Sequence, residues 1–258
     1  VTREHRSAAS RLAWVVVIMS LPLVGIVAYF FLGDTSSDRR SDKKIKDLRR
    51  DLPKRPLGDM DPPPLPLLYR QSFARAASVN GFQPVAGNRA KVTANSNESI
   101  DWLIADIDAA RDHVHLLFYI WLTDGNGTRV AEAVMRAASR GVTCRVIVDG
   151  LGSRGLLADP LWKTMKEAGV ETVVAFAFRF ALFAAFFRRL DIRNHRKIIV
   201  IDHNTTYVGS QNCADAAFLV KKKFAPWVDI MLRISGPVAW QSQRLFVSDW
   251  MVNGGTDI

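Results

Sequence analysis

The segment Arg193-Asn194-His195-Arg196-Lys197-Ile198-Ile199-Val200-Ile201-Asp202 contains a run of β-branched residues that predicts a buried strand. Side chains two apart on a strand point to the same face, so His195 and Lys197 are expected to converge on one pocket. A neutral imidazole can attack phosphorus, and a nearby ammonium neutralises phosphate oxygens. The spacing H-x-K-x4-D, which Asp202 completes, therefore predicts a phosphoryl-transfer site.

A polar turn follows this strand, Gly209-Ser210-Gln211-Asn212. Ser210 supplies a hydroxyl and Asn212 a side-chain amide, and both groups suit the binding of phosphate oxygens. The alternative is that these residues only form a turn, as Ser, Asn and Gly commonly do.

The region from about Phe82 alternates helical and strand periodicity, which predicts an α/β fold with a mixed sheet and helices on both faces. Gly150-Leu151-Gly152-Ser153-Arg154-Gly155 matches a dinucleotide-binding pattern. It lacks a carboxylate at the end of the next strand, so we interpret it as a strand-to-helix turn. The expected helices are 98–113, 129–140 and 159–168, and the expected strands are 114–121, 142–148, 170–176, 197–201 and 206–208.

A run of 21 uncharged residues, Leu12–Leu32, predicts a transmembrane helix, because it just spans a hydrocarbon core of ~30 Å. Trp14 and Tyr29 near its ends suit the membrane interfaces. A buried soluble helix and a cleaved signal peptide are the alternatives. Three Lys and Arg residues precede the run and nine lie in 39–55, so we expect the C-terminal part to be cytoplasmic.

These patterns predict three parts: a membrane segment 1–33, a basic and Pro-rich linker 34–81, and a catalytic domain 82–258. The basic stretch is equally compatible with binding anionic headgroups and with being a solvated linker. The Phe-rich segment 173–190 begins as a core strand, and its second half is either core or an interfacial wedge. The chain starts with Val1 and ends at Ile258, and we expect residues to be missing at both ends.

The net charge of +10 favours phosphate-bearing partners, either nucleic acid or anionic lipid. The 48% of apolar residues argue against intrinsic disorder, and two cysteines give no disulfide framework. His113, His115 and His203 show no metal-ligand spacing along the sequence.

The H-x-K-x4-D motif and the Gly-Ser-x-Asn turn resemble the signature of the phospholipase D superfamily. The apolar N-terminal run, the segment Phe118-Tyr119-Ile120-Trp121, Arg196, and the segment from Trp227-Val228-Asp229 through Gly236-Pro237 to Asp249-Trp250 are similar to bacterial cardiolipin synthases. The resemblance implies phosphatidylglycerol as substrate, a phosphohistidine intermediate, and cardiolipin and glycerol as products. It implies no cofactor and no metal, and it makes nucleic acid an improbable partner.

The resemblance also implies roles for individual residues. His195 would be the nucleophile or the acid/base partner, and Lys197 would bind phosphate. Asp202 would either organise the strand end or touch substrate. Asp229 would orient His195 through its other ring nitrogen, or be a structural aspartate.

Members of this family carry two H-x-K motifs, one in each half, whereas this sequence has one. We therefore interpret the chain as an N-terminal half whose site is completed by a missing C-terminal half or by a second copy. Two alternatives remain, a homodimeric single-motif phosphodiesterase or nuclease and a non-catalytic membrane-bound lipid-binding module.

Overall fold

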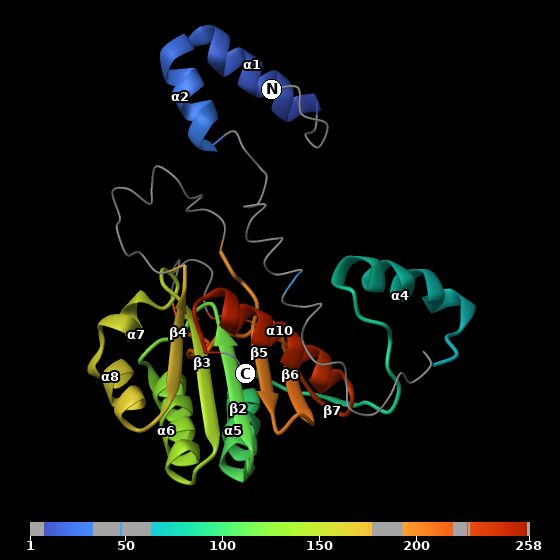
Figure 1. Ribbon diagram of the computed structural model, residues 1–258, viewed down its shortest axis with the longest axis vertical. Helices are drawn as coiled ribbons and strands as arrows, with labels where there is room; N and C mark the ends of the chain where they lie inside the picture. The colour runs from blue at the N-terminus through green and yellow to red at the C-terminus, as the bar shows by residue number, and fades with distance from the viewer. Residues whose placement is uncertain are drawn as a thin grey trace. The chain divides into compact units, whose positions relative to one another are not determined.

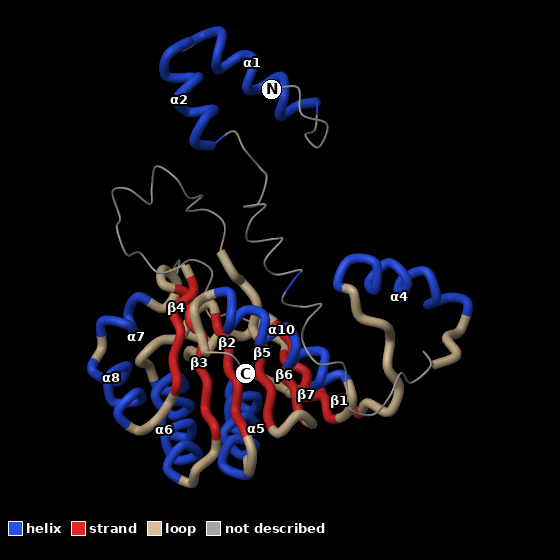
Figure 2. Tube along the Cα trace, viewed as in Figure 1, coloured by secondary structure: helices blue, strands red, loops and turns tan. Residues whose placement is uncertain are grey.

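The computed structural model describes residues 8–32, 47, 63–176, 193–218, 226 and 228–256. The chain divides into two compact units, 1–44 with 178–193, and 45–177 with 194–258. Figure 1 labels the helices and strands, and Figure 2 separates them by type. The helices are α1 (Ala8–Ser20), α2 (Pro22–Leu32), α4 (Leu67–Asn80), α5 (Ser96–Ala109), α6 (Gly125–Ser139), α7 (Arg154–Ala158), α8 (Pro160–Glu167) and α10 (Val238–Val252). The strands are β1 (Arg89–Val92), β2 (His113–Phe118), β3 (Thr143–Asp149), β4 (Glu171–Ala175), β5 (Ile198–Ile201), β6 (Thr205–Gly209) and β7 (Met231–Ser235).

The seven strands form one mixed sheet in the order β1-β7-β6-β5-β2-β3-β4. β2, β3 and β4 run parallel to one another, while β5, β6, β7 and β1 pair in antiparallel fashion. The parallel strands are joined by helices, as parallel connections require. The α/β class with a mixed sheet is confirmed.

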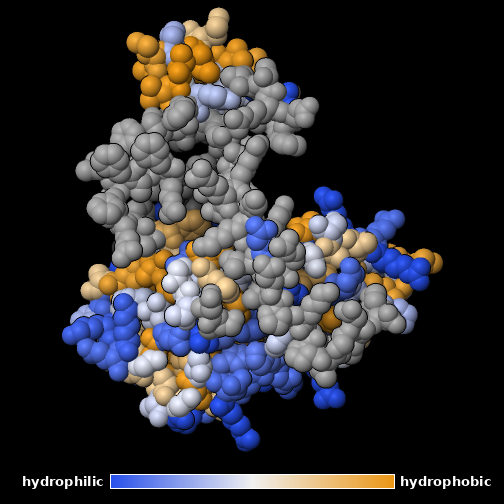
Figure 3. Space-filling view, viewed as in Figure 1, coloured by the Kyte–Doolittle hydropathy of each residue, from blue (hydrophilic) through white to orange (hydrophobic). Residues whose placement is uncertain are grey.

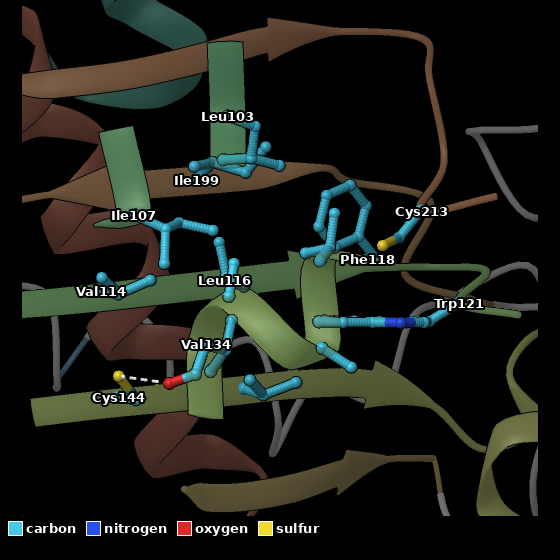
Figure 4. Packing of buried hydrophobic residues seen from close by; sticks show 14 of the residues in the cluster. Leu103, Ile107, Val114, Leu116, Phe118, Trp121, Val134, Cys144, Ile199 and Cys213 are labelled. Atoms are coloured by element: carbon cyan, nitrogen blue, oxygen red, sulfur yellow. Dashed lines mark hydrogen bonds between the residues drawn. The ribbon is translucent and has the colours of Figure 1, made fainter. Parts of the chain in front are cut away.

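The sheet has a hydrophobic layer on each face. Residues of α5, α6 and α8 pack with alternate residues of β2, β3 and β5 on one face, and Figure 4 shows Leu103, Val134 and Ile199 in this layer. Phe246 and Trp250 of α10 pack on the other face. Helices therefore cover both faces, as the alternating sequence pattern predicted.

The ends of two core helices are fixed by short polar side chains. Asn95 caps α5 by accepting hydrogen bonds from the backbone N–H groups of Asn97 and Glu98 at 2.9 and 3.0 Å. Asp159 caps α8, which has Pro160 at its first position. The observed elements differ from the expected ones mainly at their ends: the helix expected at 98–113 spans Ser96–Ala109, and the strand expected at 114–121 is His113–Phe118.

The prediction of one continuous transmembrane helix over Leu12–Leu32 is wrong. The structure places two helices there, which bend at Leu21 and pack on each other, with the Trp14 and Tyr29 ring centroids 5.3 Å apart. Pro22 explains the break, because it lacks a backbone N–H and its ring clashes with the preceding helical turn. Neither of these helices, nor any other in the described ranges, has both the length and the apolar character to cross a bilayer.

The α1–α2 hairpin is apolar on most of its surface, as the orange side chains in Figure 3 show. Leu23 is 83% exposed and Met19 is 77% exposed. Gly25 allows the two helices to approach, since a Cβ there would lie 2.7 Å from the Cα of Ile18. A helix of a soluble protein normally buries its apolar stripe and exposes a polar face, whereas this hairpin exposes many apolar side chains.

Two other segments bear on the expected domain boundaries. The linker expected at 34–81 contains α4, which ends at Gly81 in the left-handed conformation with φ 78°. The basic stretch 39–55 and the second half of the Phe-rich segment lie outside the described residues, apart from Asp47.

Candidate active site

The candidate site lies at one edge of the sheet, where several strands end or begin. β2 and β5 pair antiparallel with Leu117 opposite Ile198, so the chain that leaves β2 passes beside the residues that precede β5. β6 ends and β7 begins at the same edge, with Gly209 opposite Met231. The topology therefore brings segments that are distant in sequence to one place.

His195 and Lys197 lie together at this edge. The exposed imidazole of His195 stacks on the ring of Tyr119, with centroids 4.1 Å apart and an interplanar angle of 26°. The Lys197 ammonium donates to the backbone carbonyl of His195 at 3.0 Å and lies 5.9 Å from the centre of the Tyr119 ring. His195 and Lys197 thus lie close together beside Tyr119, although both precede β5, which begins at Ile198, and the strand expected from Lys197 starts one residue later.

The Lys197 ammonium is half-buried, and burial lowers its pKa below the ordinary value of 10.5. The Asp229 carboxylate opposes this effect and favours the charged form. Lys197 is therefore a cation held in a partly dry site beside a carboxylate, an environment in which its charge acts more strongly on a bound anion.

Ser210 and Asp229 form a pair that joins the ends of β6 and β7. The Ser210 hydroxyl donates to Asp229 Oδ1 at 2.7 Å and accepts from the backbone N–H of Ile230 at 3.2 Å. Gly209 permits this approach, since a Cβ there would lie 2.1 Å from the carbonyl oxygen of Ile230. Among the described residues Asp229 hydrogen-bonds to Ser210, and none of the hydrogen bonds seen there joins Asp229 to His195.

Asn212 fastens the polar turn to the chain that leaves β2. Its Oδ1 accepts from the backbone N–H of Ile120 at 3.2 Å, and Cys213 N–H donates to the carbonyl of Ile120 at 3.1 Å. Gln211 is buried and its amide donates to the carbonyl of Ser96 at 2.8 Å. The turn is therefore held by Asn212 and Gln211, while Ser210 faces Asp229.

Asp202 lies at the opposite end of β5. An extended chain advances about 3.3 Å per residue, so Asp202 is about 17 Å from Lys197 along the strand. Its carboxylate accepts hydrogen bonds from the backbone N–H groups of Arg111, Asp112 and His113 at 3.0, 2.9 and 3.0 Å. Burial alone would raise the pKa of Asp202, but these three hydrogen bonds outweigh it and lower the pKa. The structure thus separates Asp202 from His195 and Lys197 and ties it to the start of β2.

Three side chains near Asp202, those of Asp112, His113 and His203, offer ligand atoms within 4.8 Å of one another. The absence of metal-ligand spacing along the sequence thus missed a cluster that the fold assembles from the start of β2 and the β5–β6 turn. His113 Nδ1 is already hydrogen-bonded to Asp112 Oδ2 at 3.0 Å. This group lies at the far end of the sheet from His195 and is not part of the candidate site.

Sequence reasoning missed Tyr119 as a site residue. The sequence feature related to Tyr119 is Gly152, which belongs to the dinucleotide-like pattern. A side chain at position 152 would clash with Tyr119, because a Cβ there would lie 2.3 Å from the Tyr119 carbonyl oxygen and 3.1 Å from its ring. The glycine-rich segment is a turn that leads into α7, as interpreted, and Gly152 lets that turn pass close to Tyr119.

The fold and the H-x-K face define a phospholipase D-like protein. Residues 103–250 match the family model described as "Cardiolipin synthase, PLD-like domain", and residues 1–33 match the model described as "Phospholipase_D-nuclease N-terminal". The chain belongs to the family of cardiolipin synthase, phospholipase D-like domains.

Curated relatives carry the corresponding name. The chain is 34% identical over 262 residues to cardiolipin synthase A of Erwinia tasmaniensis, and 33% identical over 264 residues to that of Yersinia pseudotuberculosis. Each match covers 99% of this chain and 53% of the relative, so the chain spans about half the length of these proteins. A solved phospholipase D family member, Nuc of Salmonella typhimurium, aligns over 67% of this chain and 100% of its own, with 16% identity and a TM-score of 0.48.

Proposed function

We propose that this chain is the N-terminal half of a membrane-associated cardiolipin synthase, which transfers a phosphatidyl group from one phosphatidylglycerol to another. The observation that carries the proposal is the pairing of His195 and Lys197 on one face at the sheet edge, beside Ser210 and Asp229. Relatives that share 33–34% identity over almost the whole chain are named cardiolipin synthase A.

In this mechanism one histidine attacks the phosphorus of phosphatidylglycerol, and glycerol leaves after its oxygen receives a proton from the other histidine. The hydroxyl of a second phosphatidylglycerol then attacks the phosphohistidine, gives its proton to that acid/base histidine and releases cardiolipin. His195 supplies one of these two imidazoles. The other comes from the half of the protein that this chain does not span, or from a second copy.

Lys197 binds the phosphate oxygens, on which negative charge accumulates in the transition state. Ser210 and Asn212 complete the phosphate pocket: the Ser210 hydroxyl lies beside Asp229, and the Asn212 amide nitrogen has no hydrogen bond to any described residue. The Asp229 carboxylate raises the pKa of Lys197 against the larger effect of burial and so favours its charged form. Asp202 we assign to the organisation of the strand end, because three backbone N–H groups occupy its carboxylate. The reaction needs no metal or cofactor.

We further propose that the α1–α2 hairpin inserts into the bacterial inner membrane with the catalytic domain on the cytoplasmic side. Its exposed apolar surface supports insertion, and the excess of basic residues in 39–55 over those before Leu12 supports the orientation. Phosphatidylglycerol and other anionic lipids are then the partners at hand, and nucleic acid is not required.

The experiment is product analysis with the complete protein encoded by the reading frame that contains this chain. Purified protein in detergent micelles is given phosphatidylglycerol, and products are identified by mass spectrometry. The proposal predicts cardiolipin and free glycerol in equal amounts. Absence of cardiolipin, with hydrolysis of single-stranded DNA or a small phosphodiester by a dimer of a one-motif protein, would favour the phosphodiesterase alternative. Lipid binding without turnover of any kind would favour the non-catalytic module.

A further inference from the structure

Asp249 of α10 holds both neighbours of His195. The amide of Asn194 donates to Asp249 Oδ2 at 3.1 Å, and the guanidinium of Arg196 donates through Nη2 to Oδ1 at 2.9 Å. The Asn194 side-chain oxygen in turn accepts from the backbone N–H and from Nε of Arg196, both at 3.1 Å. Two hydrogen bonds to the Asp249 carboxylate and two between Asn194 and Arg196 thus hold the residues on either side of His195.

The residues on both sides of His195 are held against α10. Ile198 and Val200 of β5 pack in one cluster with Phe246 and Trp250 of α10. Just before β5, Asn194 and Arg196 bond to Asp249 of the same helix. His195 lies between them, and its imidazole stacks on the ring of Tyr119. Fixing the side chains on both sides of His195 fixes the backbone from which its imidazole projects.

The Asp249 carboxylate is buried, while its partner Arg196 is partly exposed. The Asp249 side chain is 5% exposed, and its neighbour Trp250 and the preceding Phe246 are fully buried against the sheet. In such surroundings charge-assisted hydrogen bonds are strong, and loss of one partner is costly. The bond to Asp249 also engages the charge of Arg196 on the α10 side, whereas the Lys197 ammonium lies near the Tyr119 ring on which His195 stacks.

We propose that Asp249 is a positioning residue, which acts through Asn194 and Arg196 to hold the His195 imidazole in line with the phosphorus of the bound lipid. The inference rests on the proposed function of His195. In the described part of the chain Asp249 bonds to Asn194 and Arg196 and not to the imidazole itself, so its removal should lower kcat through misplacement of His195 and leave lipid binding, and hence KM, nearly unchanged.

The test compares Asp249→Asn with the unaltered complete protein on phosphatidylglycerol in micelles. A displacement of about 1 Å at a reacting group costs on the order of 100-fold, so we expect a fall in kcat of about that size with little change in KM. Arg196→Gln should show a similar loss. The double variant should be no worse than the worse single variant, because both changes remove the same Arg196–Asp249 hydrogen bond.

Asp106→Asn is the matched control. Asp106 accepts a bidentate hydrogen bond from Arg233 at 2.6 and 2.8 Å and one from the Tyr207 hydroxyl, so it is also a carboxylate bonded to an arginine and a third polar group. Its loss should lower the melting temperature as much as that of Asp249 and leave kcat unchanged. If Asp249→Asn fails to fold, Asn194→Ala keeps the Arg196–Asp249 pair and should still lower kcat by about 10-fold.

Equal kcat in folded Asp249→Asn and the unaltered protein would overturn the inference, and so would additive losses in the double variant or a rise in KM with kcat preserved. These outcomes are distinct from failure of the proposed function, which would appear as absence of cardiolipin from the unaltered protein, or as full phosphatidyl transfer by a His195→Asn variant.

Discussion

The imidazole of His195 stacks on the aromatic ring of Tyr119, with centroids 4.1 Å apart and planes inclined by 26°. Tyr119 leaves the end of β2 and His195 precedes β5, so the contact joins two parts of the sheet that are 76 residues apart in sequence. The stack covers one face of the imidazole and limits its rotation. In the proposed mechanism the stack therefore holds the reacting ring nitrogen of His195 in one direction before substrate arrives.

This stack predicts different effects for two changes at Tyr119. Tyr119→Phe keeps the aromatic ring and should retain most of kcat. Tyr119→Ala removes the face on which the imidazole rests and should lower kcat by about 10- to 100-fold. Steady-state kinetics on phosphatidylglycerol measure both, and equal losses in the two variants would show that the hydroxyl, not the ring, is what matters.

The environment of Lys197 predicts the alkaline limit of activity. Burial lowers the pKa of this ammonium, and Asp229 raises it again in part. Activity requires the charged form, so it is present below the pKa of Lys197 and is lost as pH rises through it. Asp229→Asn removes the opposing charge and should move the alkaline limb of kcat/KM to lower pH. An alkaline limb that stays in place or moves upward would contradict this account of Asp229.

Asp202 is expected to matter for stability and not for chemistry. Its pKa is lowered in the folded protein, so its contribution is present above the unfolded value near 3.8 and is lost as pH falls through the folded value. Asp202→Asn should cost about 2 kcal/mol in urea unfolding at pH 7, because an amide replaces one acceptor oxygen and the charge. Asparagine tolerates the observed φ of 49°. A large fall in kcat of the folded Asp202→Asn variant would show instead that Asp202 takes part in the active site.

The buried His115 should lower the free energy of unfolding in mild acid. Burial, with the charges of His113, Arg145 and His203 also contributing, lowers its pKa to about 2, while a hydrogen bond to Gln243 opposes the shift. The unfolded chain takes up the proton near pH 6.5, so stability is full above that pH and falls by ~1.4 kcal/mol per unit below it. Between pH 6.5 and 5 the unaltered protein should lose ~2 kcal/mol from this group. His115→Gln should flatten that decline, and an unchanged slope would exclude His115 as its source.

Chelation should leave catalysis unchanged. Within the described part of the chain, the one group of three His, Cys or acidic side chains close enough to share a metal is Asp112, His113 and His203, at the end of the sheet remote from His195. Dialysis against EDTA should therefore preserve kcat. Loss of activity on dialysis, with recovery on addition of a divalent cation, would contradict a metal-free mechanism.

The sequence was informative where local geometry decides the outcome. Alternation along a strand predicted that His195 and Lys197 share a face; the two lie close together, but both precede β5, and hydrogen bonds to Asp249 hold Asn194 and Arg196 toward α10. The four residues between Lys197 and Asp202 likewise fix the separation of these two side chains, since a strand of that length is extended.

The contacts that complete the site depend on tertiary pairing, which local patterns do not contain. Asp249 lies 53 residues beyond Arg196, and its partner is set by the packing of α10 on β5. The edge strand β1 has the sequence Arg-Ala-Lys-Val, and all four residues are exposed, so no alternation of buried and exposed residues could predict it. Pro22 was visible within the apolar run, but composition and length outweighed the local steric signal in the prediction of one helix.

The central claim is that His195 is one of the two histidines that carry the phosphatidyl transfer. The most direct test is the initial rate of cardiolipin formation by the complete protein with His195→Asn, compared with His203→Asn at the other end of β5. His203 adopts φ 53°, which asparagine tolerates, so the two variants differ in position and not in chemistry. The account predicts loss of cardiolipin formation in His195→Asn and near-normal formation in His203→Asn. Comparable rates in both variants would contradict it.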